Sequence, residues 1–293
     1  MSTYILIFTL LFITASLALI AWLALRFIPN NQVGVVEKLW SLTGSVPEGH
    51  ILALTGEAGF QADLLRGGIH CGYWRWQYRV HICPLVTVPQ GKIGYVYARD
   101  GKPLPPSQTL GRAVECNNFQ DAHAFLLGPQ PTQLEPLSDL PTHDADGREK
   151  PAPLGYDLTG QRGRQLVLLR EGVYAINPAL FIVLTENTAY ALPRLLSKHE
   201  RASIQSWRDE LASIAGFEPV RIGQALEVAD PLHPDQTHVV DSIGIVTIHD
   251  GSSLAPGEII APAVGCHVGE RHFHNNFQDP QRFLDGGGRR GRQ

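Results

Sequence analysis

Residues 59–68 read GFQADLLRGG, and residues 163–172 read GRQLVLLREG. The second stretch repeats the Gly, Gln, Leu, Leu, Arg and Gly of the first in register. Self-similarity of this kind is typical of chains that are built from repeated structural units. We therefore interpret these residues as a repeat frame, made of Gly59, Gln61, Arg66 and Gly68 in the first copy and Gly163, Gln165, Arg170 and Gly172 in the second.

The differences between the two copies favour a building block over an active site. Asp63 of the first copy is replaced by Val167 in the second, although the residues around it are kept. A catalytic acid is not expected to vanish from a copy that preserves its frame. We expect Arg66 and Arg170 to pair with carboxylates of neighbouring units, and anion binding is the alternative.

Further repeated stretches divide the chain into three units. A strand-like segment with an internal Gly precedes a turn and a Pro/Gly connection, and the Gly–x–Gln frame follows. The repeated pairs are IGYVYARDGKPLPP (93–106) with IGIVTIHDGSSLAP (243–256), NNFQD (117–121 and 275–279), and GQRGRQ (160–165) with GRRGRQ (288–293), while VGVV (33–36) is a weaker copy. Unit one thus covers 33–90, unit two 91–190, and unit three 241–293, where the chain is expected to end inside a repeat.

Local patterns within the units predict short strands and turns. Asp-Gly at 100–101 and 250–251 indicates hairpin turns. Residues 165–185 are rich in β-branched side chains and are broken at Gly172 and Pro178, which predicts two short strands. Residues 69–88 alternate as a half-buried strand does, and NNFQDAHAFL (117–126) predicts a helical turn on the sheet, with Asn as its cap.

Two segments have no counterpart in the other units. Residues 129–157 are rich in proline and acid, which predicts a surface insertion. Residues 191–240 form a helical connector, in which Ser197 and Glu200 make a capping box for a helix ending near Gly216. The apolar stripe of that helix consists of Ile204, Trp207, Leu211 and Ile214. We expect it to pack on the core, and contact with a partner or a membrane surface is the alternative.

The N-terminus carries a candidate membrane anchor, assigned to residues 1–26. Residues 4–25 contain no charged side chain, and 22 helical residues span roughly 33 Å, close to the thickness of a hydrocarbon core. The segment lacks the basic start and the cleavage site of a signal peptide. Arg26 and Lys38 follow it, so the positive-inside rule predicts a single-pass protein of the cell membrane with its soluble part in the cytoplasm. A periplasmic soluble part is the alternative.

Composition excludes some function classes. Lys plus Arg number 24 and Asp plus Glu number 28, so there is no basic footprint for nucleic acid. Gly and Pro, at 29 and 21 residues, indicate many turns and short strands. The four cysteines have no CxxC spacing, and we expect them to be reduced and buried.

Candidate chemistry is sparse. The sequence contains no G-x-S-x-G elbow and no phosphate loop, so we assign no catalytic residue and no cofactor. Imidazole and thiolate are zinc ligands, which makes one C-terminal cluster a weak metal candidate. Its spacing fits no standard finger, and its members are Cys266, His267, His272 and His274.

The chain resembles bacterial flotillin-like proteins of the SPFH or band 7 superfamily, which includes stomatins, prohibitins and flotillins. The anchor followed by IPNNQVGVVEKLW (28–40) carries this resemblance, together with residues 56–101, the NNFQD motif and GQRGRQLVLLREGVYAIN (160–177). It implies an α+β fold, in which a single transmembrane helix precedes β-rich SPFH-like repeats with short helices. Units one and two would occupy 27–190. The long coiled coil with which flotillins continue is absent from 241–293.

The resemblance also implies a function. Members of this superfamily are non-enzymatic membrane scaffolds that form large oligomers and organise membrane microdomains, so membrane lipid, further copies of the chain and a client membrane protein are the expected partners. The alternatives are an accessory regulator of a membrane protease or other membrane enzyme, and a zinc-dependent hydrolase. Aromatic rings suit membrane interfaces, so the residues expected to contact the bilayer or a neighbouring subunit are Trp22, Tyr73, Trp74, Trp76 and Tyr78.

Overall fold

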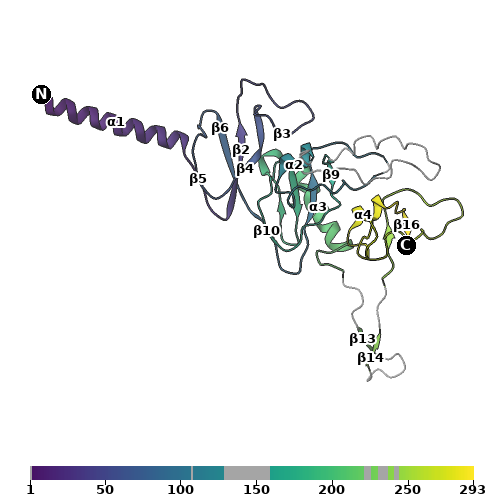
Figure 1. The fold of residues 1–293 in the computed structure, drawn as a ribbon. Coiled ribbons are helices and arrows are strands. Elements are labelled where there is room, and N and C mark those ends of the chain that lie inside the picture. The colour runs from purple at the N-terminus through teal and green to yellow at the C-terminus, as the bar shows by residue number, and fades with distance from the viewer. Residues whose placement is uncertain (1, 107, 129–158, 221–225, 230–236, 241–243) are drawn as a thin grey trace.

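The computed structural model describes residues 2–106, 108–128, 159–220, 226–229, 237–240 and 244–293. It is an α+β structure with an apolar N-terminal helix, as the sequence predicts. Helix α1 projects away from the sheets, and the C-terminal unit lies at the opposite end of the molecule (Figure 1). The insertion predicted at 129–157 lies outside the described residues.

The described elements are short apart from α1 and α3. The helices are α1 (Ser2–Ala24), α2 (Ala122–Leu127), α3 (Lys198–Ile214) and α4 (Pro280–Asp285), with a 3-10 helix η2 (Pro193–Leu195). The strands are β1 (Arg26–Ile28), β2 (Gln32–Lys38), β3 (Leu52–Ala53), β4 (Gly59–Leu65), β5 (Gly68–His70), β6 (Tyr78–Pro84), β7 (Val86–Val88), β8 (Tyr95–Ala98), β9 (Gly163–Arg164), β10 (Gly172–Tyr174), β11 (Phe181–Leu184), β12 (Ala189–Tyr190), β13 (Leu226–Ala229), β14 (Thr237–Val240), β15 (Thr247–Ile248) and β16 (Gly291–Arg292).

Two four-stranded sheets form the centre of the molecule. Their strand orders are β3-β4-β2-β6 and β12-β11-β8-β9, and smaller pairs join β1 to β5, β7 to β10, β13 to β14 and β15 to β16. Strands β10 and β11 confirm the two short strands predicted within 165–185. In all three units the first strand meets the frame glycine in the same register, with Lys38 opposite Gly59, Ala98 opposite Gly163, and Ile248 opposite Gly291.

The Gly–x–Gln frame adopts one geometry in all three units. The glycine has a left-handed φ of 140°, 118° and 125° at Gly59, Gly163 and Gly291. Glycine is favoured there because it has no Cβ to clash. The glutamine two residues later turns back, and its side-chain amide donates to the carbonyl oxygens two and four residues before it. These distances are 3.0 and 2.9 Å for Gln61, 2.9 and 2.7 Å for Gln165, and 3.3 and 2.8 Å for Gln293.

The NNFQD motif is also built in the same way twice. Its Asn-Asn-Phe residues have φ values of 50°, 52° and 63° at 117–119, and of 46°, 52° and 63° at 275–277. The following aspartate caps the next helix, with Asp121 accepting from the Ala124 N–H and Asp279 from that of Arg282. The predicted short helix is therefore confirmed as α2, but the prediction of an Asn cap is wrong, because the asparagines adopt the left-handed turn.

The predicted Asp-Gly hairpins are wrong. Strand β8 pairs with β9 and β11, and neither follows Gly101 directly. Asp100 instead is a buried residue whose carboxylate accepts from the N–H groups of Gly101 at 2.7 Å and Ile51 at 2.6 Å, and contacts His50 Nδ1 at 3.1 Å. These contacts join unit two to unit one, so the acid holds two units together rather than forming a hairpin.

One apolar core is shared by units one and two. It includes Val35 of β2, Val96 of β8, Phe125 of α2 and Phe181 of β11. Buried Asn177 reinforces the junction, because its side-chain amide donates to the carbonyl oxygens of 61 and 62 at 3.1 and 3.0 Å. Sequence repeats that resemble one another thus pack into a common core.

The two frame arginines do not make the predicted ion pairs. In the described part of the chain, both side chains are exposed and neither contacts a carboxylate. Their backbone carbonyls are used instead, with Arg66 accepting from His70 Nε2 at 2.7 Å and Arg170 from the Tyr174 hydroxyl at 2.9 Å. In both copies the ring four residues after the arginine thus binds the arginine's backbone carbonyl, so the repeated spacing serves a main-chain contact.

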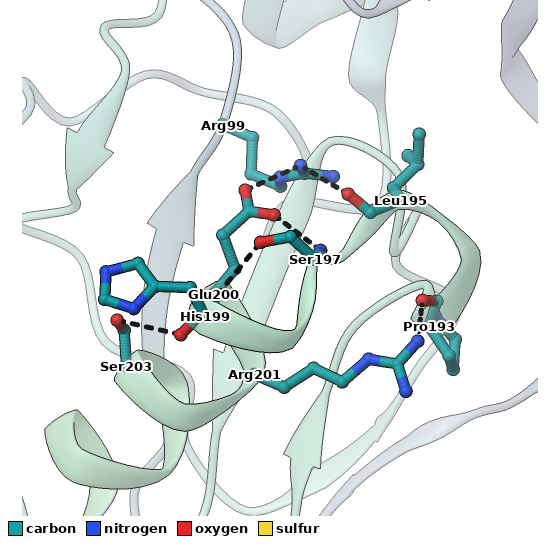
Figure 2. A network of polar contacts seen from close by, with 8 residues as sticks. All are labelled: Arg99, Pro193, Leu195, Ser197, His199, Glu200, Arg201 and Ser203. Carbon is teal, nitrogen blue, oxygen red and sulfur yellow. Dashed lines mark hydrogen bonds and ion pairs between the residues drawn. The ribbon is translucent and has the colours of Figure 1, made fainter.

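Helix α3 begins as its sequence predicts. Ser197 accepts from the Glu200 N–H at 3.2 Å, and the Glu200 carboxylate accepts from the Ser197 N–H at 2.7 Å (Figure 2). Arg99 of unit two reaches this helix start, and its guanidinium donates to the Leu195 carbonyl at 3.2 Å and lies 3.6 Å from Glu200. The predicted stripe packs on the second sheet through Ile204, Trp207 and Leu211, whereas Ile214 is exposed at the last turn, so its predicted burial is wrong.

Candidate membrane-contact site

Helix α1 is long and apolar enough to cross a membrane. The candidate span runs from Tyr4 to Ala24, and its most apolar stretch is not buried within the protein. Leaving apolar surface exposed to water costs about 25 cal/mol of free energy for each Å². The helix is therefore more stable in an apolar environment. The structure describes no membrane, and the length and composition of α1 are what identify the span.

The loop 71–77, which joins β5 to β6, holds the C-terminal end of α1. The last carbonyl groups of a helix have no partner within the helix. Here the Tyr73 N–H donates to the Ala24 carbonyl at 3.2 Å, and the Arg75 N–H donates to the Leu23 carbonyl at 3.1 Å. Arg75 Nε donates to the Trp22 carbonyl at 3.0 Å. The loop therefore ties the end of the apolar helix to unit one.

The same loop gathers aromatic side chains. The Arg75 guanidinium carbon lies 4.6 Å from the centre of the Trp22 ring, within the range of a cation–π contact. The rings of Trp74 and Trp76 stack at 4.8 Å between centroids, with 15° between their planes. The alternation predicted within 69–88 is confirmed in β6 but is wrong for residues 71–77, because they form a loop between β5 and β6 that contacts α1.

Two of the predicted contact residues face inward. Tyr73 and Tyr78 meet edge to face at 5.5 Å and pack against the small apolar cluster of Ile28, Val36 and Leu65. Burial, with smaller contributions from Asp63 and Tyr78, raises the pKa of Tyr73. These tyrosines therefore support the loop from the protein side, while Trp22 and Trp76 are exposed.

Two apolar residues beside the helix end were not among the individual contact residues predicted from the sequence, although Ile69 lies in the aromatic segment 69–78 that was expected to contact the bilayer. Phe27 of β1 lies opposite Ile69 of β5, and their exposed fractions are 68% and 70%. The direct continuation of α1 into the strand sequence Arg26–Ile28 was the available signal. Burial and the nearby positive charge of Arg75 lower the pKa of Arg26, which directly precedes Phe27 in β1. We call Trp22, Phe27, Ile69, Trp74, Arg75 and Trp76 the helix-end surface.

The Cys/His cluster does not converge on a metal. Among the described residues, no group of three or more His, Cys, Asp or Glu side chains could hold a metal ion. His274 is buried with both ring nitrogens used, Nε2 on the Val264 carbonyl at 2.7 Å and Nδ1 accepting from the Phe277 N–H at 2.8 Å. Cys266 is exposed, and its thiol lies 3.6 Å from the same carbonyl.

A cleft of about 350 Å³ lies beside the NNFQD turn of unit two and is lined by residues 113–116, 118, 119 and 167. Burial raises the pKa of Cys116 in its wall to about 11, so this thiol stays protonated near neutral pH. Cys83 and Cys116 are buried and all four cysteines are free, whereas Cys71 and Cys266 are exposed. The prediction of burial is thus wrong for two of them.

The structure therefore brings the five predicted aromatic residues together around the end of α1. Trp22 is about fifty residues away from the other four in the sequence. The structure adds Arg75, Phe27 and Ile69 to them. The repeat-frame glycines and Gln61 lie in strands, and Gln165 forms an isolated bridge with Gly111, whereas Arg66 and Arg170 lie outside the strands with exposed side chains. Comparison of the chain with family models, curated proteins and solved structures found no match.

Proposed function

We propose that this protein is a membrane-anchored, non-enzymatic scaffold that oligomerises and organises membrane microdomains. The observation that carries the anchoring is the attachment of α1 to unit one. The apolar helix is held at three consecutive carbonyls by loop 71–77, beside exposed Trp22 and Trp76. A helix in a bilayer that is fixed in this way would place the first sheet directly at the membrane surface.

The chemistry of the helix-end surface supports this placement. Tryptophan rings favour the headgroup level, and arginine keeps its charge at the polar boundary while its stem covers apolar surface. Phe27 and Ile69 would then lie at the boundary between headgroups and acyl chains. Arg26 and Arg75 flank the helix end, which fits the cytoplasmic side under the positive-inside rule.

Co-flotation with lipid vesicles tests the anchoring. The full chain, reconstituted into vesicles of phosphatidylethanolamine and phosphatidylglycerol, is expected to float and to resist extraction at high pH. A chain that stays at the bottom of the gradient would contradict the proposal. Particle size in mild detergent tests the scaffold, since a monodisperse monomer at all concentrations would argue against oligomerisation.

The side of the membrane has its own test. Cys266 is exposed. It belongs to the C-terminal unit, which lies at the far end of the molecule from α1 (Figure 1). In intact cells an impermeant maleimide is expected to leave it unlabelled, and permeabilised cells should label it. Labelling in intact cells would place the soluble part outside the cytoplasm.

A further inference from the structure

Loop 39–44, which follows β2, presents apolar side chains outward. Its sequence is LWSLTG, and the exposed fractions of Leu39, Trp40 and Leu42 are 41%, 49% and 98%. From Leu39 to Pro47 the chain has no charged side chain. Large apolar side chains that gather on a surface without charges mark a region that contacts another molecule or a membrane.

Three polar side chains fix the backbone around this loop. The Gly56 carbonyl accepts hydrogen bonds from Lys38 Nζ at 2.6 Å and from the Ser41 hydroxyl at 2.8 Å. The Thr43 hydroxyl donates to the same carbonyl at 3.2 Å. The polar side chains thus turn back onto the protein, and the apolar ones between them are left outside. Because the loop is already held in place, a contact through it costs little ordering entropy.

Loop 39–44 lies beside loop 71–77. Strand β2 ends where its partner β6 begins, and one residue further the Leu39 N–H donates to the Gln77 carbonyl at 2.8 Å. Loop 71–77 also binds the last carbonyls of α1. Both loops therefore share the end of the first sheet to which the apolar helix is tied, and loop 39–44 adjoins the helix-end surface.

The other two units carry a different residue at this point. Counted along the strand that pairs with the frame glycine, Trp40 occupies the position of Asp100 in unit two and of Asp250 in unit three. Both acids are buried, and each accepts from the N–H of the glycine that follows it, at 2.7 and 2.8 Å. The unit attached to α1 thus has an exposed indole ring where the other two have a buried acid.

We propose that loop 39–44 is a second point of contact between unit one and the lipid bilayer. The Trp40 ring lies at the headgroup level, and Leu42 enters the boundary between headgroups and acyl chains. The occupant is the bilayer because a membrane that holds α1 also lies against the end of the sheet to which α1 is tied. No charged side chain of the loop has to leave water in this arrangement.

This inference rests on the proposed membrane anchoring. Two apolar side chains bind a membrane weakly by themselves, but an anchored chain keeps them at a high effective concentration beside the lipid. A single helix leaves the soluble part free to rotate and tilt on the membrane. A second contact on the same sheet sets its orientation, so that every anchored copy presents the same face to its neighbours.

Quenching of a fluorescent probe by lipid tests the contact. In a full chain with Cys71→Ser and Cys266→Ser, the probe NBD is attached at Leu42→Cys, a position that is almost fully exposed. The chain is reconstituted into the same phosphatidylethanolamine and phosphatidylglycerol vesicles, with and without nitroxide-labelled lipid. We expect the labelled lipid to quench the probe. The matched control is Val268→Cys in the C-terminal unit, 87% exposed, where we expect no quenching.

Changes to the neighbouring ring separate the loop from the probe. With the probe at Leu42→Cys, the variant Trp40→Asp gives unit one the acid that the other units carry at this position. A carboxylate avoids the acyl boundary and is repelled by phosphatidylglycerol. Quenching should therefore fall to the level of the Val268→Cys control, whereas Trp40→Phe, which keeps an aromatic ring, should preserve it. Equal quenching in the two variants would overturn the inference.

A probe at Phe27→Cys reports on the helix-end surface separately. It is expected to be quenched if α1 holds the first sheet at the membrane. Quenching at Phe27→Cys without quenching at Leu42→Cys, or equal quenching at Leu42→Cys and Val268→Cys, would refute the second contact and leave the anchoring intact. A chain that does not float, or that shows quenching at neither position of unit one, would contradict the placement of this sheet at the membrane and with it the second contact.

Discussion

Gln165 offers a sharp test of the repeat frame through the variant Gln165→Glu. Its side chain is buried in unit two, with 5% of the residue exposed, and its amide donates to the carbonyls of Gln161 and Gly163. Glutamate has nearly the same shape but no N–H. When it is ionised, a carboxylate oxygen faces two carbonyl oxygens in place of an amide nitrogen.

The size of the effect follows from these contacts. Two hydrogen bonds of about 1 kcal/mol each are lost, and the two carbonyls are left without a side-chain donor. A buried, unpaired carboxylate adds to this, for a total of about 3–5 kcal/mol in the free energy of unfolding at pH 7. The buried site also raises the pKa of the new carboxyl, because burial and the carbonyl dipoles both disfavour its charge.

The pH dependence has a definite sign. Since the folded pKa of the introduced carboxyl is raised above the unfolded value of about 4.3, its contribution to the stability of the variant is most favourable below that value. There the protonated acid donates one hydrogen bond and recovers part of the loss. The deficit relative to wild type grows as pH rises through the folded pKa and is constant above it.

Urea unfolding in mild detergent, followed by tryptophan fluorescence, measures the difference. Trp207 packs against Tyr97 at 5.2 Å and reports on the second sheet. Gln61→Glu makes the same change at the same frame position in unit one, where the side chain is only partly buried, and is expected to cost about half as much. A Gln165→Glu variant within about 0.5 kcal/mol of wild type, or one with the same deficit at pH 4.5 and pH 8, would refute this reading of the frame.

Three further changes test other contacts. Arg75→Ala removes a charged hydrogen bond and a cation–π contact, which together contribute about 2 kcal/mol. Hydrogen exchange at the Tyr73 amide in vesicles should therefore become roughly 30-fold faster. The control Arg79→Ala should change that exchange rate by no more than about twofold. Cys116→Ala tests burial of the thiol. Because the folded pKa of about 11 lies above the ordinary 9.0, the wild-type free energy of unfolding should fall by up to about 3 kcal/mol between pH 9 and pH 11. If the variant loses stability with pH as steeply as wild type, this explanation is contradicted. Ser197→Ala removes the capping oxygen of α3 and should lower the free energy of unfolding by about 1 kcal/mol in thermal denaturation, whereas Ser203→Ala, inside the helix, should not.

Features that depend on residues close together in the sequence were predicted correctly. The uncharged run at the N-terminus, the capping box of α3 and the two strands around Pro178 depend on neighbours within a few residues, and the structure confirms each of them. The third unit, recognised by repeated letters, has the same frame geometry in Gly291 and Gln293 as the other two. Turn conformations were harder to predict. Asp-Gly and Asn-Asn are compatible with several turn types, and the surrounding packing decides which one forms.

The sequence by itself determined that this chain has an apolar helix, repeated β segments and a frame in which glycine and glutamine recur while Asp63 is not kept in the second copy. Composition and spacing are enough for these features because backbone geometry and capping are local. Only the tertiary structure decided that loop 71–77 holds the end of α1 through Arg75 and that Asp100 joins two units. Each depends on a contact between residues far apart in the chain, whose distance is set when the hydrophobic core closes.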